Sequence, residues 1–369
     1  MATNRQIIQV VPRLLPARCG VSDHAIALAL ELRTSCGIDS SFVVLNSEER
    51  SNLPFPITHC APHQLLNACV ASSGNRPAAI LVHLSGYGYS ADGAPSILAE
   101  ALEQVKADGR FQIAVFFHEL FAGGMPWTSA FWYAQRQKRA YRRIAKMCDL
   151  PVTNARVFAS WLERQIVTPI ECIPVFSQVG EAEQHIPFAG RDPVMAVFGL
   201  GGTRQRVYRE LNKLGEILRR LGVEEILDIG PACEAPDGVN GIPVKRMGVL
   251  AAAEIDRQFA RTAFGYLAYP PNCLAKSGVL AAYTAHGVIP VIARHFREEF
   301  DGLRDGVHVL SPQTAQAMEQ NGLEECSRAA WRWYSGHRLR DHAAMYDRWL
   351  GAADGPGRSA EQGVEREHA

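Results

Sequence analysis

Residues 276–291 read KSGVLAAYTAHGVIPV, and this stretch decides the fold class that we expect. It predicts a small-residue loop, a short helix, a glycine stop and a buried apolar strand in succession. A helix that opens on Lys276, Ser277 and Gly278 presents free backbone N–H groups and a positive dipole end, with a lysine beside them. The stretch therefore predicts an α/β architecture and a place for a phosphate group.

The same alternation of strands and helices extends over most of the chain. It runs through 1–175, lapses over the linker-like segment 176–192 and restarts over 193–336. This pattern predicts an α/β protein with two Rossmann-like, doubly wound domains that face a central cleft. Ligands of such sheets bind at the carboxyl ends of the strands. A terminal helix over 337–350 is expected to cross back to the first domain, and 351–369 is expected to be disordered.

The individual elements follow from hydrophobic periodicity. The predicted strands are 7–11, 41–45, 79–84, 113–117, 152–153, 170–174, 194–198, 225–229, 243–246, 264–268 and 288–292. The predicted helices are 22–33, 63–71, 94–107, 129–147, 155–165, 205–221, 251–260 and 277–286, with helical periodicity again over 314–350.

The composition argues against several classes of protein. The 369 residues are 47% hydrophobic and 21% charged, as in ordinary soluble globular proteins. A formal net charge of zero and an isoelectric point near 7.2 argue against a nucleic-acid-binding protein. No stretch reaches the roughly 20 apolar residues that cross a bilayer, and the start of the chain does not resemble a signal peptide. Nine scattered cysteines without a Cys-x-x-Cys pair favour reduced thiols in a cytoplasmic protein over a disulfide framework or a zinc site.

The turn after the first predicted strand is a candidate ligand contact. Gly20 allows the backbone to approach a ligand closely, and Ser22 or Asp23 can cap the following helix. His24 is expected to be an ordinary histidine of that helix. A capped turn without a ligand is the alternative for this loop.

Two further loops follow predicted strands of the first domain. Loose glycines with Tyr87 and Tyr89 suit sugar recognition through hydroxyl groups and rings, so both tyrosines are candidate acceptor-binding residues. A glycine-rich surface turn is the alternative. His118 and Glu119 follow the next strand, at the edge where catalytic groups collect in such folds. Either is a candidate catalytic base or sugar ligand, and a buried structural histidine is the alternative.

The predicted helix over 129–147 has a strongly basic face. Trp127, Phe131 and Trp132 lie near its start, and no acidic residue occurs from 120 to 148. Such a face favours peripheral contact with anionic lipid or with a polyprenyl-phosphate acceptor, and a solvated helix surface is the alternative. The basic residues are Arg136, Lys138, Arg139, Arg142, Arg143 and Lys146.

The second domain opens with a strand, a glycine turn and a helix start. Backbone amides at Gly201 and Gly202, together with Arg204 and Arg206, are candidates for holding a diphosphate. A dinucleotide fingerprint is a weak alternative, because Arg204 replaces its third glycine and Asp228 lies inside the second strand rather than at its end.

Taken in order, these motifs resemble those of glycosyltransferases with the GT-B fold, specifically the family-4-like enzymes (glycosyl transferases group 1). The resemblance extends from 19–23 through 87–89, 118–120 and 198–199 to 287–291. It implies a first domain that binds a glycan or lipid-linked acceptor and a second that binds a nucleoside-diphosphate sugar. It also implies hexosyl transfer in polysaccharide or glycoconjugate synthesis, with no metal or other cofactor. We expect a cytoplasmic location, at the inner face of the membrane.

The resemblance also assigns roles by position. Gly20 would line the cleft, and His118 would contact the donor sugar. Fixed positive groups on the donor phosphates would stabilise the departing nucleotide. The groups that would meet these phosphates are Arg204 or Arg206, Lys276, and the helix N–H groups at Ser277 and Gly278.

One departure from the family pattern bears on activity. The family's two glutamates, eight residues apart, are expected near Leu274 and Ala282, and neither position is acidic. Lys276 occupies this neighbourhood instead. We therefore expect a divergent transferase. The alternatives are a catalytically silent GT-B module that binds a glycan or a protein partner and, more distantly, a dehydrogenase.

Overall fold

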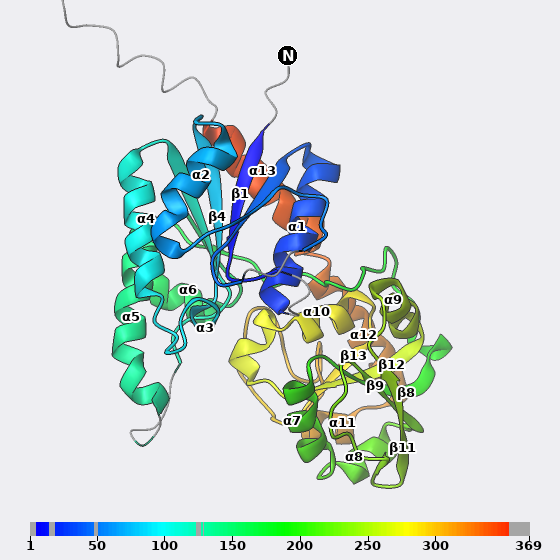
Figure 1. Cartoon of the computed structure of the whole chain (residues 1–369). Helices are drawn as coiled ribbons and strands as arrows, with labels where there is room; N and C mark the ends of the chain where they lie inside the picture. Colours follow the sequence, from blue (N-terminus) through cyan, green and yellow to red (C-terminus); the bar gives the residue numbers. More distant parts are fainter. Residues whose placement is uncertain (1–4, 15–18, 48–50, 123–126, 128, 354–369) are drawn as a thin grey trace, which may run out of the picture.

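The protein folds into two lobes, each built on its own sheet (Figure 1). The computed structural model describes residues 5–14, 19–47, 51–122, 127 and 129–353. The first sheet is parallel, with the strand order β3-β2-β1-β4-β5-β6-β7. The second has the order β10-β11-β9-β8-β12-β13 and is parallel except for the pair β10 and β11. The predicted α/β fold with two Rossmann-like halves is confirmed.

The first lobe and the linker contain the elements up to η2. The strands are β1 Gln6–Val11, β2 Asp39–Val44, β3 Ile57–His59, β4 Ala78–Leu84, β5 Phe111–Phe117, β6 Leu150–Thr153 and β7 Glu171–Cys172. The helices are α1 Gly20–Cys36, η1 Pro62–Gln64, α2 Leu65–Ser73, α3 Gly86–Tyr89, α4 Ser96–Asp108, α5 Ser129–Met147, α6 Arg156–Glu163 and η2 Phe188–Gly190.

The remaining elements form the second lobe and the helix that leaves it. The strands are β8 Asp192–Phe198, β9 Glu225–Ile229, β10 Gly238–Val239, β11 Ile242–Gly248, β12 Thr262–Leu267 and β13 Ile289–Ile292. The helices are α7 Gly201–Leu211, α8 Gly215–Arg220, α9 Ala252–Arg261, η3 Pro271–Lys276, α10 Gly278–Ala285, α11 Pro312–Ala317, α12 Gln320–Tyr334 and α13 Leu339–Ala353.

Both faces of the first sheet are covered by helices. Ile80 and Val82 of β4 belong to a core with side chains of α2, α4 and α5, while Ala79 and Leu81 belong to a second core with α1 and α13. Neighbouring residues of a strand point to opposite faces, so a strand buried on both sides reads as a continuous apolar run. This burial explains why the central strands could be predicted from sequence.

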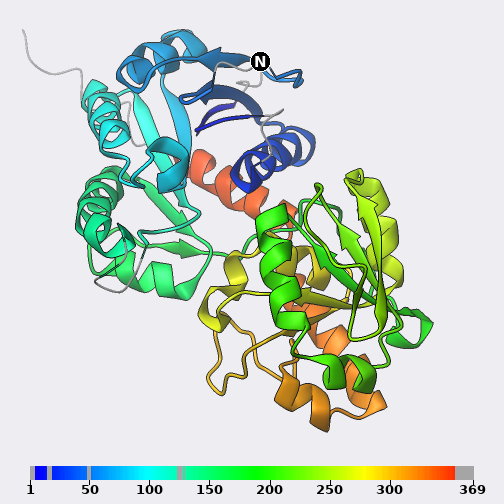
Figure 2. The same cartoon turned by 60° about the horizontal axis from the view of Figure 1, so that its bottom comes forward.

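The last helix returns to the first lobe. α13 lies beside α1 in both views (Figures 1 and 2), and Tyr346 shares an apolar core with Leu28 and Leu32 of α1. His342 Nε2 lies 2.9 Å from the carbonyl oxygen of Pro174, to which it donates a hydrogen bond. Of the segment expected to be disordered, 351–353 complete α13 and 354–369 lie outside the described residues.

Some elements differ from the sequence-based expectation. The helix predicted over 205–221 is two helices, α7 and α8. The side-chain amide of Asn240 donates to the carbonyl oxygens of Leu211 (3.3 Å) and Asn212 (3.4 Å) and so satisfies the end of α7. Strands β3 and β10 were not predicted, and the glycine-rich loop after β4 forms the short helix α3.

Candidate functional site

A cleft of about 560 Å³ lies between the lobes, at the carboxyl ends of their strands. The strand order reverses between β1 and β4 in the first sheet and between β8 and β12 in the second. Ligands of open α/β sheets bind outside the strand ends at such points. The second lobe lines the cleft with the loops after β8, β9 and β12 and with the first turn of α10, and the first lobe lines it with α1.

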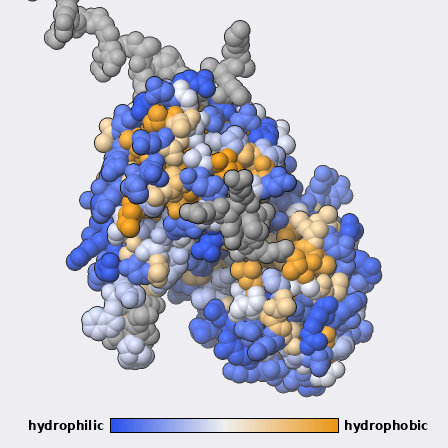
Figure 3. Space-filling view, in the orientation of Figure 1, coloured by the Kyte–Doolittle hydropathy of each residue, from blue (hydrophilic) through white to orange (hydrophobic). Residues whose placement is uncertain are grey.

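The wall of this cleft is mostly apolar. Leu200 and Val249 are 51% and 47% exposed, and Val279 lies beside them in the lining. The surface of the second lobe is accordingly apolar where it meets the first lobe (Figure 3). Among the described residues that line the cleft, Asp23 alone carries a charge. Such a wall suits a flat or apolar part of a ligand, while a diphosphate needs cationic or N–H groups at its edge.

Glu119 and Lys276 come from different lobes and form an ion pair. Lys276 Nζ lies 2.8 Å from Glu119 Oε1. The lysine side chain is 19% exposed and the glutamate side chain 49%. The backbone N–H of Val175 donates to the carbonyl of Ala275 at 3.0 Å and holds the adjacent loop in place. Two residues that the sequence assigned to different tasks, catalysis and donor binding, are thus brought together.

The predicted phosphate site lies at the start of α10, which is a capped helix start. Ser277 is buried, and its hydroxyl oxygen accepts the N–H of Leu280 at 3.2 Å, so Ser277 acts as the N-cap. Gly278 and Val279 both line the cleft. A methyl group added at Gly278 would meet no atom within 4 Å, so the first turn of α10 borders open space.

His118 lies directly after β5 and is 8% exposed. Its Nε2 lies 3.2 Å from Nδ1 of His83, and its carbonyl accepts a hydrogen bond from Asn154 at 3.0 Å. Burial lowers the pKa of His118 well below its ordinary value, and the charges of His83, His342 and Lys276 lower it further. His118 is therefore neutral at pH 7, so it offers a ligand hydrogen bonds rather than a positive charge.

Arg204 does not face the cleft as a free cation, which corrects the prediction that it grips a diphosphate. Its side chain is fully buried and ion-paired with Asp228 of β9, and Tyr208 donates to the same carboxylate. The guanidinium also donates to the carbonyl oxygens of Gly199, at 2.9 Å, and Pro231. Every one of these bonds is made within the protein, so Arg204 holds the loops after β8 and β9 in place.

The other residues of this predicted diphosphate site are dispersed. Arg206 is exposed on α7 and does not line the cleft within the described chain. Gly201 and Gly202 form the first turn of α7, and their neighbours Leu200 and Thr203 line the cleft. The start of α7 therefore borders the cleft, but its arginines do not supply charge there.

Gly20 lines the cleft, and its carbonyl accepts a hydrogen bond from Gln178 at 3.0 Å. A methyl group added at Gly20 would meet no atom within 4 Å, so the backbone is open to a ligand. The predicted cap at Ser22 is wrong, because α1 begins at Gly20 and the Ser22 hydroxyl donates to the carbonyl of Arg13 at 2.7 Å.

The two predicted acceptor tyrosines have different surroundings. Tyr87 is 51% exposed, and its hydroxyl oxygen accepts from Gln137 at 3.3 Å. The Tyr89 hydroxyl lies 3.1 Å from the carbonyl oxygens of both Val10 and His83, to which it donates. Tyr89 therefore braces the strand ends, and Tyr87 is the one of the pair that presents a ring to solvent.

The positions of the two expected glutamates also differ from each other. Leu274 and Ala282 are both buried, and of the two only Ala282 is among the residues that line the cleft. Alanine at position 282 offers no side-chain group that could bond a hydroxyl of a ligand in this cleft. The glutamate that the family resemblance places here therefore has no counterpart at position 282.

Two basic side chains of helix α5 form ion pairs with acidic residues of the first lobe. Arg143 pairs with Glu103 at 2.9 Å, and Arg136 pairs with Asp92 at 3.3 Å. Trp127 and Trp132 are 77% and 71% exposed. Over the described part of the chain, no helix combines the length and the apolar character needed to cross a membrane.

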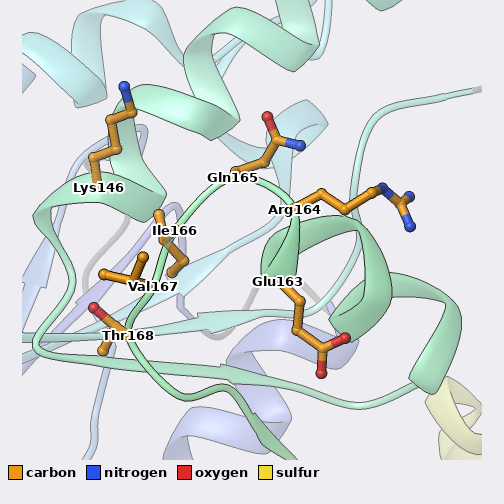
Figure 4. A pocket seen from close by; sticks show the side chains of 7 residues that line it. All are labelled: Lys146, Glu163, Arg164, Gln165, Ile166, Val167 and Thr168. Carbon is orange, nitrogen blue, oxygen red and sulfur yellow. The ribbon is translucent and has the colours of Figure 1, made fainter.

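A second hollow, of about 420 Å³, lies beside the end of α5 (Figure 4). Lys146 and the segment 163–168 line it. The charged side chains of Lys146, Glu163 and Arg164 point in different directions rather than toward a common point. None of the predicted site residues lies there, so we place the candidate site in the cleft between the lobes.

Sequence reasoning missed several residues that shape this site. Gly230 has φ +147°, and a side-chain carbon there would overlap the carbonyl oxygen of Gly199, which itself has φ +126°. Gly230 is required by the close approach of two loops, and Gly199 is required by its positive φ. His83 and Gln9 lie behind His118 and could not be linked to it from sequence spacing.

No protein-family profile and no curated protein sequence matches the chain. Solved structures match over nearly its whole length. The pneumococcal O-GlcNAc transferase GtfA is 9% identical, with 95% of this chain and 99% of that chain covered and a TM-score of 0.59. The lipopolysaccharide outer core galactosyltransferase WaaB is 10% identical, with 94% and 99% covered and a TM-score of 0.55.

A third match is a different kind of enzyme. The UDP-GlcNAc 2-epimerase from Neisseria meningitidis is 8% identical, with 94% of this chain and 100% of that chain covered and a TM-score of 0.54. At such identities the likeness concerns the fold. The chain has the GT-B fold, the two-lobed fold of nucleotide-sugar glycosyltransferases.

Proposed function

We propose that the chain is a glycosyltransferase that moves a hexosyl group from a nucleoside-diphosphate sugar to a glycan or lipid-linked acceptor, in polysaccharide or glycoconjugate synthesis. One observation carries the proposal: the Glu119–Lys276 ion pair joins the residue that follows His118 in the first lobe to the residue that precedes the N-cap of α10 in the second. The GT-B fold supports it, and the pneumococcal neighbour was solved in complex with UDP and GlcNAc.

The residues around the cleft would have different roles. The nucleotide would lie against the apolar wall, with its diphosphate at the first turn of α10. Lys276 would exchange Glu119 for the phosphate and stabilise the negative charge that develops on the leaving nucleotide. His118, neutral and almost buried, would bond a sugar hydroxyl, and Glu119 would act as the base for the acceptor hydroxyl. The phosphates would thus be met by fixed positive groups rather than by a metal ion.

Nucleotide binding tests the donor site first. Calorimetric and thermal-shift titrations with UDP, GDP, ADP and their sugar conjugates should show saturable binding of one nucleotide class. Lys276→Ala should weaken that binding by roughly 1.5–3 kcal/mol, the range of a hydrogen bond to a charged group. Lys245→Ala, which removes an exposed lysine of β11, is the matched control. Equal affinity in the two variants would remove Lys276 from the site.

Turnover tests the role of His118. His118→Ala should abolish sugar transfer while nucleotide affinity stays within a few-fold of wild type, because His118 is assigned to the sugar. An active variant would make this histidine structural. Product analysis is required as well, because the meningococcal epimerase shows that the same fold serves another class of enzyme.

A catalytically silent GT-B module is the second candidate. The observation that favours it is Ala282, which lines the cleft where an acidic side chain is expected, together with the apolar lining. In that case a folded protein would show no response to any nucleotide of the panel. The cleft would then bind a glycan or a protein partner without turnover.

We also propose peripheral membrane contact through α5, at the cytoplasmic face. The exposed Trp127 and Trp132 and the basic side chains of α5 support it. The chain should co-sediment with phosphatidylglycerol vesicles and not with phosphatidylcholine vesicles, and Trp132→Ala should weaken this binding. Arg209→Ala, an exposed change on α7, is the control. Equal binding to both kinds of vesicle would contradict an electrostatic contact.

A further inference from the structure

Three buried histidines meet beneath the first lobe's side of the cleft. His83 lies in β4, His118 follows β5 and His24 lies on α1. One ring nitrogen from each of them lies within 4.8 Å of the others. His24 and His83 are fully buried. Three elements that are far apart in the sequence thus place three imidazole rings close together.

The orientation of His83 is fixed by a second layer of side chains. Gln9 Nε2 donates to Ser40 Oγ at 3.1 Å, so Gln9 Oε1 accepts from His83 Nε2 at 2.8 Å. The proton of the neutral His83 ring therefore lies on Nε2, and Nδ1 points its lone pair at His118. Metal-binding histidines are commonly oriented in this way, by a hydrogen bond from the other ring nitrogen to an oxygen.

The spacing also fits a metal ion. Nδ1 of His83 and Nε2 of His118 are 3.2 Å apart. Two nitrogens that each lie about 2.0–2.1 Å from a tetrahedral Zn²⁺ are about 3.3 Å apart.

His24 gives an independent indication. Neither of its ring nitrogens has a hydrogen-bond partner among the described residues, although both are buried. The ring is held between Phe176, with the ring centres 4.2 Å apart, and His118, with the ring centres 4.8 Å apart. Buried polar groups are nearly always satisfied, so an imidazole with two unsatisfied nitrogens indicates a missing partner.

We propose that His24, His83 and His118 bind one divalent transition-metal ion of the zinc type. The cluster contains imidazoles and no carboxylate among the described residues, which suits zinc rather than magnesium or calcium. The ion would tie α1 to the ends of β4 and β5. This assignment goes beyond the proposed function, because it places the ion in the first lobe and not on the donor phosphates.

Metal binding would also fix the hydrogen-bonding character of His118. Without the ion, His118 Nε2 donates to His83 Nδ1, and its own Nδ1 is then an acceptor. With the ion on Nε2, the proton of the neutral ring moves to Nδ1, which becomes a donor. The metal would thus set which group His118 offers to a ligand.

X-ray absorption on the full-length protein tests the site directly. After chelator treatment and dialysis, the protein should take up one Zn²⁺ per chain in a calorimetric titration. The spectrum of the loaded protein should show three imidazole nitrogens at about 2.0–2.1 Å and no sulfur at about 2.3 Å. Sulfur ligands would overturn the proposal, since the chain has nine cysteines that offer an alternative site. Absence of stoichiometric uptake would overturn it as well.

Variants then assign the ligands. His24→Gln should weaken Zn²⁺ binding at least tenfold. Gln9→Leu, which removes the partner of His83, should weaken it about 10–100-fold. His63→Gln, an exposed histidine, should have no effect. Equal affinities in all three variants would refute the assignment, and the absorption spectrum of the wild type decides it even if His24→Gln does not fold.

Discussion

The two lobes share one architecture, but each has one buried polar residue, Arg204 or His24, whose bonding state differs from that of the other. In the second lobe Arg204, Asp228 and Tyr208 are bonded to one another, and Arg204 also holds the loops after β8 and β9. In the first lobe His24 lies buried, and neither of its ring nitrogens has a partner within the part of the chain that the structure describes. Both groups lie beneath strand ends at the cleft. A paired network there is scaffold, whereas an unpaired group indicates a place for a ligand.

The largest effect is expected from a substitution that disrupts the network of Arg204, Asp228 and Tyr208. Arg204→Met leaves the Asp228 carboxylate buried without its cation, so the free energy of unfolding should fall by about 3–5 kcal/mol. Arg206→Met, an exposed change on the same helix, should stay within about 0.5 kcal/mol of wild type. Urea unfolding measures both. If the two variants were equally stable, Arg204 would not be a scaffold residue.

A smaller effect is expected where the loops of the second lobe approach each other. Gly230→Ala should lower the free energy of unfolding by about 1–3 kcal/mol, because φ +147° and the Gly199 carbonyl leave no room for a side chain. Gly278→Ala borders the same cleft in open space and should leave the stability nearly unchanged. The melting temperatures of the two variants separate the effect of backbone strain from the effect of a position at the cleft. Equal melting temperatures would show that the loops can move apart.

Acid titration probes a buried histidine outside the cluster. Burial lowers the pKa of His337 from its ordinary 6.5 to about 3. Between these values the unfolded chain binds a proton and the folded chain does not, so stability rises with pH and is lost as the pH falls below 6.5. The loss approaches about 1.4 kcal/mol per pH unit.

The matched variant is His337→Phe, which keeps a ring against Trp333 and Tyr334. Urea midpoints from pH 7 to pH 5 should fall less steeply in this variant than in wild type. The slope does not vanish, because burial also lowers the pKa of His83 to about 3 and of His342 to about 4. Parallel slopes would mean that His337 is solvated in the native state.

The difference between local patterns and contacts of distant residues explains what the sequence could predict. Apolar strands and amphipathic helices are local patterns, so both sheets and most of their helices follow from periodicity. The β10–β11 hairpin had a local signal too: Asn240 and Gly241 adopt φ +52° and +86°, as a tight Asn-Gly turn requires.

The site was harder to predict because its contacts are between distant residues. Gly278 lines the cleft, and Lys276, two residues before it, pairs with Glu119 of the other lobe, a contact that no sequence spacing reveals. The partner of Arg204 lies on another strand, and no spacing in the sequence reveals that the pair is buried. His24 likewise resembles an ordinary helix histidine until β4 and β5 bring two more imidazoles beside it.

The smallest expected effect concerns the ion pair that joins the lobes. Glu119 is half exposed, so a double-mutant cycle with Lys276→Ala and Glu119→Ala should give a coupling of only about 0.2–1 kcal/mol in the free energy of unfolding, and less at high salt. The same Lys276→Ala change is expected to cost more in nucleotide affinity than in stability. A weak ion pair can release its lysine to a phosphate at little cost. A coupling above about 2 kcal/mol would mean that the pair holds the lobes together, and Lys276 would then not be available to the donor phosphate.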